Sequence, residues 1–285
     1  MSVHASKIIW SADLPWTDLL KVIDAKILPP EVMIKLDQAF FTAALASPLK
    51  SGKPLNQLSL TDFSSLYLIY KLIGKIHELG HPIFIDWKMS EIPSKTDIIG
   101  SDLSGFLPSM LNCMAGSLYT TGLFESQDVN KMDGLKRYAE TCKYHDIAPC
   151  AVTVLTSKDD SPNTGVVFHE FRRRAPQQVL FYARLLVQAG FTDMVCSPQE
   201  ADLIRENPYF DSLNLNCPGI RLPGSDTRDQ KRIMTPRRAL ELGINRLVIG
   251  SDITGDKKQQ QEVPDPVERI AANWQRLNTH LEGGN

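Results

Sequence analysis

The chain has 285 residues, 42% of them hydrophobic and 22% charged, and its formal net charge is -2 at pH 7. That length and apolar content suffice for one large buried core, so we expect a single domain over residues 1–285. The charge balance shows no basic surplus, which argues against nucleic acid and anionic membranes as partners.

Cysteine usage and the N-terminal sequence predict a cytoplasmic protein. The five cysteines are odd in number, lack C-x-x-C spacing and mostly lie in apolar runs, as reduced and buried thiols do: Cys113, Cys142, Cys150, Cys196 and Cys217. We therefore expect no zinc site. No basic segment with a long apolar core opens the chain and no run of 18 apolar residues follows, so neither secretion nor a membrane span is expected.

The first third of the chain alternates strand-like and helix-like patterns. Residues 7–13 form an apolar run that ends in an acid, and TDLLKVIDAKI after it has helical spacing. Residues 32–35 repeat the format and end in a lysine, and the helical pattern LYLIYKLIGKIHELG that follows is expected to end at Gly80. Residues 82–88 are the third predicted strand.

Five further strand-like runs follow, at residues 110–115, 150–155, up to 197, 213–217 and 247–250. Helical patterns separate them, including FYARLLVQAG and PQEADLIRE, the second of which is expected to start at Pro198. The polar stretch 257–263 is expected to be a flexible loop. Eight strands alternating with helices predict a parallel sheet of the (β/α)8 TIM barrel type. The alternative is an open doubly wound sheet, but the G-x-G-x-x-G motif typical of that fold does not follow the first strand.

Charged residues collect where the predicted strands end. In a (β/α)8 barrel this is the face that carries active sites. In the third strand, the period-2 geometry of a regular strand places Asp86 and Lys88 on one side. The residues that we expect on this face are Asp13, Lys35, Asp86, Lys88, Ser157, Ser197 and the loop 218–229. Two lysines and several carboxylates on one rim predict a site where charged lysines donate a proton or stabilise an anion.

The stretch PGIRLPGSDTRDQKRIMTPRRALELG, at residues 218–243, resembles the signature loop and following helix of the orotidine 5'-phosphate decarboxylases. The flanking segments SAD, IKLD, FIDWKMSEIP, AVTVLTS and VCSPQEA agree, so the resemblance spans nearly the whole chain. It implies a homodimeric (β/α)8 barrel that converts orotidine monophosphate to UMP and CO2 in pyrimidine biosynthesis, with no metal or organic cofactor.

The resemblance also implies roles for single residues. Lys35, Asp86 and Lys88 would be catalytic, and Glu91 would complete the charged tetrad of the partner subunit. Asp13 would bind the ribose hydroxyls and Ser157 the pyrimidine. The remaining substrate-binding residues would lie in the phosphate-binding segments: Pro218, Gly219, Arg221, Gly224, Gly250 and Ser251.

The chain departs from the family pattern mainly at the phosphate. Ser251 stands where an arginine is expected, and Pro223 where a glutamine is expected. Each charge-assisted bond lost is worth about 1.5–3 kcal/mol unless another cation replaces it. The candidate replacements are Arg221, Arg228, Lys257 and the three arginines at 172–174. Smaller departures are Glu91 for an aspartate, Lys95 for a threonine and Met114 for a histidine.

Two other functions stay open at this point. One is a divergent barrel enzyme with a different substrate, like the magnesium-dependent sugar-phosphate decarboxylases and aldolases, although Lys35 stands where those carry a metal-binding glutamate. The other is a nucleotide-binding paralogue without activity, against which the retained Lys35, Asp86 and Lys88 argue.

Overall fold

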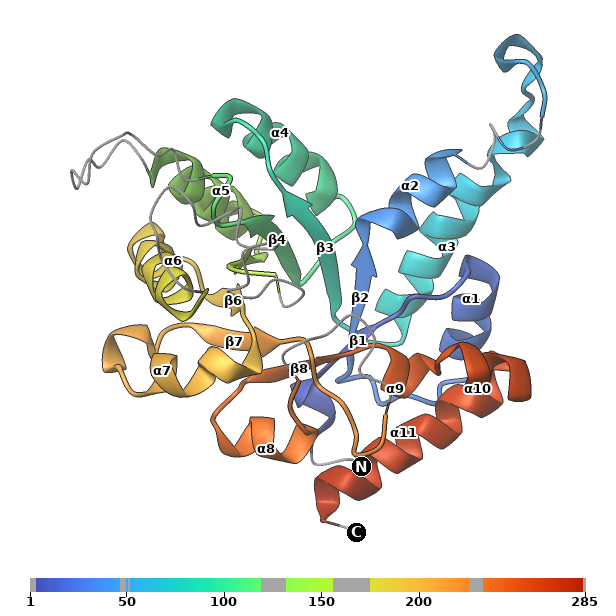
Figure 1. The fold of residues 1–285 in the computed structure, drawn as a ribbon. Helices are drawn as coiled ribbons and strands as arrows, with labels where there is room; N and C mark the ends of the chain where they lie inside the picture. Colours follow the sequence, from blue (N-terminus) through green and yellow to red (C-terminus); the bar gives the residue numbers. More distant parts are fainter. Residues whose placement is uncertain are drawn as a thin grey trace. The chain divides into compact units, whose positions relative to one another are not determined.

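A computed structural model describes residues 4–46, 50, 52–118, 132–155, 175–225 and 233–283. Eight parallel strands close into a barrel in the order β1 to β8 and alternate with helices (Figure 1). This confirms the predicted (β/α)8 fold. The strands are β1 Ile8–Ser11, β2 Met33–Asp37, β3 Ile83–Met89, β4 Met110–Met114, β5 Ala148–Val152, β6 Asp193–Val195, β7 Asn214–Cys217 and β8 Arg246–Ile249.

The helices of the described residues follow these strands. They are α1 Trp16–Asp24, α2 Gln38–Ala46, α3 Ser64–Glu78, α4 Pro93–Ser104, α5 Asp133–Tyr144, α6 Ala175–Ala189, α7 Ala201–Arg205, α8 Pro236–Glu241, α9 Ser251–Thr254, α10 Lys257–Glu262 and α11 Pro266–Glu282. Short 3-10 turns include η7 Pro198–Glu200 and η8 Pro208–Phe210. No helix in these ranges has the length and apolarity of a membrane span.

The chain divides into two compact units, residues 1–86 with 250–285, and residues 87–249. In the first, α1 packs on α3 and α11, and α11 packs on α9. In the second, α4 packs on α5, α5 on α6 and α6 on α7. The single domain over residues 1–285 stays a prediction.

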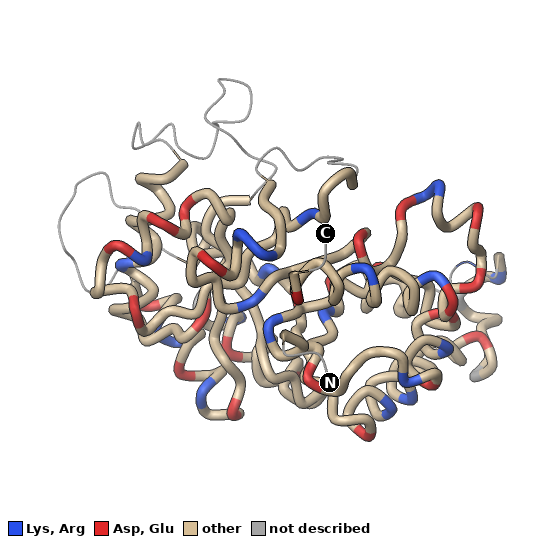
Figure 2. Tube along the Cα trace, turned by 90° about the horizontal axis from the view of Figure 1, so that it is seen from below, with Lys and Arg blue, Asp and Glu red and all other residues tan. Residues whose placement is uncertain are grey.

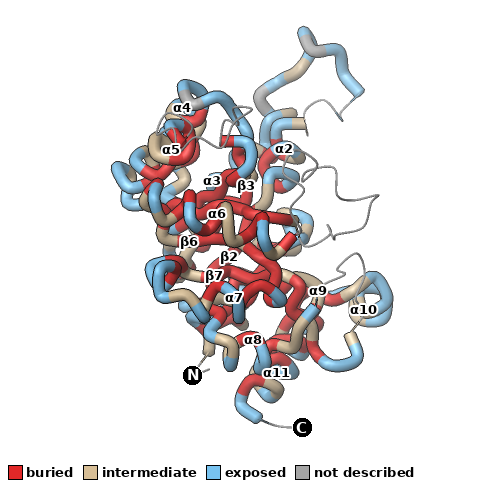
Figure 3. Tube along the Cα trace, turned by 60° about the vertical axis from the view of Figure 1, so that its left-hand side comes forward, coloured by how far each residue is buried: buried red, intermediate tan, exposed pale blue. Residues whose placement is uncertain are grey.

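Burial explains why these segments form strands and helices. Strand residues are largely buried, whereas exposed residues concentrate on helices and turns (Figure 3). Helix α11 buries Ile270, Trp274, Leu277 and Leu281, which recur at helical spacing and form one apolar stripe. All five cysteines are buried and free, as predicted. Basic and acidic residues are interspersed along the described chain (Figure 2).

The expectation of a loop at residues 257–263 is wrong, because Lys257–Glu262 form α10. The Asp256 side chain accepts a hydrogen bond from the Gln259 N–H at 2.8 Å, and the Gln259 side chain accepts one from the Asp256 N–H at 3.3 Å. This reciprocal capping box satisfies two backbone donors that a helix start otherwise leaves unpaired. The cap therefore starts a helix in a segment that has no buried side chain of its own.

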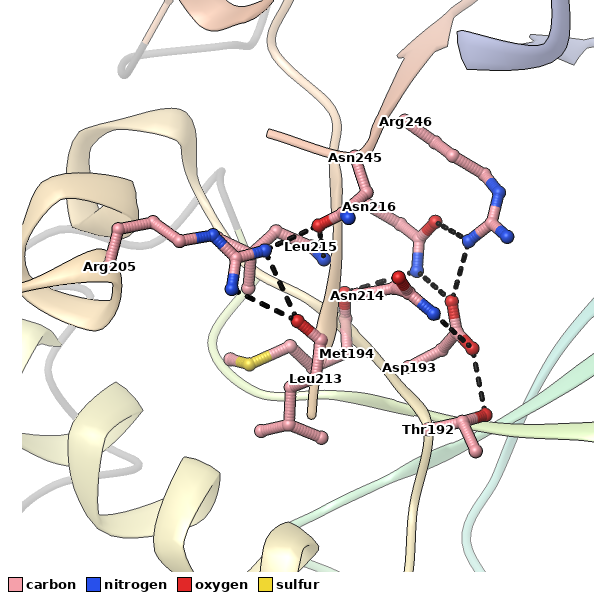
Figure 4. Close-up of polar contacts among 10 residues, drawn as sticks. All are labelled: Thr192, Asp193, Met194, Arg205, Leu213, Asn214, Leu215, Asn216, Asn245 and Arg246. Carbon is pink, nitrogen blue, oxygen red and sulfur yellow. Dashed lines mark hydrogen bonds and ion pairs between the residues drawn. The ribbon is translucent and has the colours of Figure 1, made fainter. Parts of the chain in front are cut away.

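A polar network joins the amino ends of β6, β7 and β8 in the second unit (Figure 4). The buried Asp193 carboxylate accepts hydrogen bonds from Arg246 at 2.8 Å and from Asn216 at 3.0 Å. Thr192 and Asn214 also donate to it. A buried carboxylate is tolerated only when it is paired in this way. Because this is the amino-terminal end of the strands, the network serves stability rather than chemistry.

Candidate functional site

In the first unit, β1, β2 and the part of β3 up to Asp86 bring three of the predicted residues together. Ser11 is in register with Lys35, and Asp37 is in register with Asp86. Asp13 follows β1 by two residues. Parallel strands in register end at one edge, so the side chains of these strand ends share one face of the sheet.

Lys35 and Asp86 form a buried ion pair, with Nζ and Oδ2 separated by 2.8 Å. Their exposed fractions are 8% and 7%. Burial lowers the pKa of Lys35, but the charges of Asp86 and Asp13 outweigh burial and hold that pKa above its ordinary value of 10.5. The ammonium group therefore stays charged at neutral pH and fixes a negative charge in a place with little water.

Asp13 lies at the solvent side of this pair. The Ser11 hydroxyl is 3.2 Å from both carboxylate oxygens of Asp13 and donates to them. Partial desolvation raises the pKa of Asp13, while Lys35 lowers it and Asp37 raises it. A methyl group placed on Gly250 would lie 3.7 Å from Oδ2 of Asp13. The structure thus places two predicted substrate-binding residues, Asp13 and Gly250, side by side.

A cavity of about 600 Å³ opens beside Asp13. This is the size of a small-molecule pocket, and its wall is mainly apolar with few polar groups, as is usual for such pockets. Its lining comes from the ends of β1 and β2 and from the first turns of α1 and α2: Ala12, Asp13, Leu14, Pro15, Trp16, Thr17, Asp37, Ala39, Phe40 and Ala43. The Trp16 and Phe40 rings pack edge to face, 6.5 Å between centroids.

Lys88 and Glu91 belong to the second unit. Lys88 is half-buried in β3 and Glu91 is exposed after the strand. Lys88 has φ of 53°, and its N–H donates to Oδ1 of Asn112 at 2.7 Å. A positive φ lies outside the β region, so the regular alternation assumed for Asp86 and Lys88 ends at Lys88.

The segment with the family signature is held by backbone hydrogen bonds. Met234 N–H donates to Gly219 O, and Arg221 N–H donates to Met234 O, 3.0 and 2.9 Å respectively. Gly219 and Gly224 have φ near 80°, which favours glycine. Arg221 Nη1 donates to the carbonyl of Ile220 at 2.9 Å. Pro218 is half-buried at the start of this loop.

Of the other residues predicted to bind the substrate or its phosphate, some lie in the described part of the chain and some do not. Ser251 begins α9, and Lys257 is exposed at the start of α10. Ser157, Arg228 and the arginines 172–174 lie outside the described residues. No group of three or more His, Cys, Asp or Glu side chains in the described ranges is arranged to hold a metal ion.

Three residues near the candidate site were missed in the sequence. Asp37 lines the cavity and affects the pKa of both Asp13 and Lys35, and it ends β2 as Lys35 was expected to do. The strand-end argument applied to Lys35 would also have found it. Ser11 donates to Asp13, and Asn112 accepts from the Lys88 N–H; the spacing of these residues in the sequence gives no signal for either bond.

The geometry defines a class first: a parallel (β/α)8 barrel with a buried lysine–aspartate pair at the carboxyl ends of neighbouring strands. Comparison with known proteins then gives the family. Residues 127–265 match the sequence model of the orotidine 5'-phosphate decarboxylase / HUMPS family. The chain is 32% identical to an orotidine 5'-phosphate decarboxylase of Idiomarina loihiensis over 85% of its own length and 95% of the relative. The chain belongs to this family.

Further relatives agree. An orotidine 5'-phosphate decarboxylase of Staphylococcus epidermidis is 33% identical over 71% of this chain and 80% of the relative. The crystal structure of the Lactobacillus acidophilus orotidine 5'-phosphate decarboxylase covers 95% of this chain and 99% of its own, with a TM-score of 0.62 and 22% identity. At that identity the structural likeness supports the barrel fold alone.

We predict that Lys35→Ala destabilises the protein by about 3 kcal/mol, because it leaves a buried carboxylate without its ammonium partner. Without Lys35 the Asp86 carboxylate is buried with no counter-charge, so the loss of stability should be smallest at acid pH, where Asp86 is protonated and neutral, and should grow as pH rises. Urea unfolding across pH measures this. Replacing both residues, Lys35→Met with Asp86→Leu, should recover most of the loss.

Lys75→Ala provides the control, because Lys75 pairs with the exposed Glu78 on α3 at 3.0 Å. A solvent-exposed pair of this kind contributes about 0.5 kcal/mol or less. Equal losses for Lys35→Ala and Lys75→Ala would contradict the importance of the buried pair.

Proposed function

We propose that this protein decarboxylates orotidine 5'-monophosphate to UMP and CO2, without a cofactor, in pyrimidine biosynthesis. The observation that supports it most directly is the buried Lys35–Asp86 pair at the ends of β2 and β3, where the family motif has its charged residues. We propose that the catalytic roles implied by the family resemblance apply to these two residues and to Lys88, which lies two residues further along β3.

The proposed reaction requires electrostatic stabilisation of a carbanion. Loss of CO2 from the pyrimidine ring leaves a carbanion with almost no resonance relief, so charge must be stabilised by groups fixed in advance in a water-poor site. Asp86, kept ionised by Lys35, would repel the substrate carboxylate in the ground state. Lys88 would pair with the developing carbanion and then protonate it. Both roles favour the transition state over the bound substrate, and such a difference in stabilisation lowers the activation barrier of the reaction.

Substrate binding is proposed from the same resemblance. Asp13 would accept hydrogen bonds from the ribose hydroxyls, and Ser157 would contact the pyrimidine. The phosphate would be held by the segments that contain Pro218, Gly219, Arg221, Gly224, Gly250 and Ser251. Since Ser251 and Pro223 cannot supply the expected cationic and amide contacts, we propose a weakened phosphate grip. If the protein turns over another phosphorylated substrate faster than orotidine monophosphate, we would attribute this preference to Ser251 and Pro223.

We propose a cytoplasmic homodimer in which Glu91 completes the site of the partner subunit. Glu91 is exposed, and so are its neighbours Ile92 and Ile98, at 61% and 53%. Exposed apolar side chains beside a charged residue are suited to an interface with a polar part. Light scattering at assay concentration should give the mass of a dimer. A monomer that retains full activity would contradict the shared site.

We predict that Lys88→Ala abolishes decarboxylation of orotidine monophosphate while the protein stays folded, because Lys88 is the only ionisable residue of β3 after Asp86. The loss of absorbance of the substrate measures turnover, and circular dichroism measures folding. Lys71→Ala, at an exposed position of α3, is the matched control and should keep wild-type turnover. Retention of more than a small fraction of activity in Lys88→Ala would refute the assignment.

We predict that Ser251→Arg lowers the Michaelis constant for orotidine monophosphate by about tenfold or more. One charge-assisted bond to phosphate exceeds 1.4 kcal/mol, which is about a factor of ten. The measurement is a titration of UMP and a Michaelis curve at two salt concentrations. Ser212→Arg is the control: it adds the same charge at an exposed position before β7, and it should change neither the affinity for UMP nor the Michaelis constant.

Equal UMP affinities for wild type and Ser251→Arg would contradict the weakened grip. So would tight wild-type binding that survives alanine substitution of each of the five candidate arginines, Arg172, Arg173, Arg174, Arg221 and Arg228.

A further inference from the structure

The backbone of β3 is left-handed at Lys88, with φ of 53°. Among the described residues, three other non-glycine residues have positive φ, namely Lys26, Leu107 and Asp146, and all three lie after a helix, outside any strand. A side chain with a Cβ atom pays a steric cost in this conformation, so it persists only where the surroundings enforce it. Lys88 is therefore held in a conformation that a regular strand would not adopt.

The side chain of Asn112 contacts the backbone of Lys88. Its Oδ1 accepts the hydrogen bond of the Lys88 N–H at 2.7 Å. Asn112 lies in the middle of β4 and is 1% exposed, between apolar neighbours. In a regular parallel ladder a strand N–H donates to a backbone carbonyl of the next strand. Here a side-chain oxygen accepts the bond from the Lys88 N–H.

We infer that Asn112 is a positioning residue for Lys88: its buried amide oxygen holds the left-handed backbone that sets the direction of the Lys88 ammonium group. This deepens the proposed function and rests on it, because it concerns the residue proposed to donate the proton. Asn112 would not touch the substrate. Its effect on the reaction would come through the geometry of Lys88, and a misplacement of about 1 Å can cost on the order of a hundredfold in rate.

A purely structural role makes a different prediction. An asparagine that only satisfies a buried N–H contributes to folding, and its loss lowers stability without changing chemistry. Asn216 is the matched control, because it is fully buried in β7 of the same unit and bonds to Asp193 and Met194 in the network at the amino ends of the strands. Asn216→Ala should lower the unfolding midpoint and leave kcat and KM of the remaining folded protein unchanged.

Kinetics of the full-length chain separate the two roles. For Asn112→Ala we expect kcat for orotidine monophosphate to fall at least about tenfold with KM within about threefold, since positioning acts on the chemical step. Asn112→Asp keeps an acceptor oxygen and should recover most of the lost kcat. If Asn112→Ala matches Asn216→Ala, with a lower unfolding midpoint and unchanged kcat, the inference is overturned.

Two structural measurements hold even if the protein does not act on orotidine monophosphate. In a crystal structure of Asn112→Ala, φ of residue 88 should return to negative values, and a retained positive φ would overturn the inference. Lys88→Gly should unfold at a higher temperature than Lys88→Ala, because glycine adopts positive φ without steric cost. Equal midpoints would show that the backbone is unstrained and would also overturn it, whether or not Asn112→Ala folds.

Discussion

The ion pair between Lys35 and Asp86 is the constraint on which the candidate site depends. Both groups are more than nine-tenths buried and lie 2.8 Å apart. Taking either charge out of water alone is costly, so each needs the other. The pair fixes the ends of β2 and β3 relative to each other and keeps a carboxylate ionised where the proposed reaction needs a negative charge. Asp13 and Asp37 extend this charged group toward the cavity of the same unit.

The two polar groups of the described chain lie at opposite ends of their own strands. The Asp193 network ties together the amino ends of β6, β7 and β8, while the Lys35–Asp86 pair lies at the carboxyl ends of β2 and β3. Lys35 and Asp86 are both buried, whereas Asp193 is buried and its partner Arg246 is half-buried. Asp193 has four side-chain donors around it, as a structural carboxylate should, whereas Asp13 remains open to solvent and beside a cavity. That difference in solvation separates a group that holds the fold from one suited to bind a ligand.

Much of the fold could be predicted from the sequence, because most strands lie in short apolar runs that alternate with segments of helical spacing. The strand limits differ by up to three residues: β5 ends at Val152 instead of residue 155, and β2 continues past Lys35 to Asp37. The sequence could place Lys35 and Asp86 on one rim because barrel topology brings strand ends together, but it did not show that these two residues form an ion pair. Helix α10 was missed because its capping box acts locally, in a segment without an apolar stripe. The left-handed Lys88 could not be foreseen, since its partner Asn112 lies 24 residues away and a period-2 argument assumes a regular backbone.

The central claim is that this barrel removes CO2 from orotidine monophosphate and that a lysine replaces it with a proton. The most direct measurement is a reaction of the purified wild-type protein with orotidine monophosphate in D2O, in which CO2 and UMP are quantified and the UMP is examined by NMR. The account predicts equal amounts of CO2 and UMP, with one deuterium at the ring carbon that lost the carboxylate, because lysine protons exchange with solvent. Absence of CO2 and UMP at micromolar to millimolar substrate, with the protein folded, would contradict it.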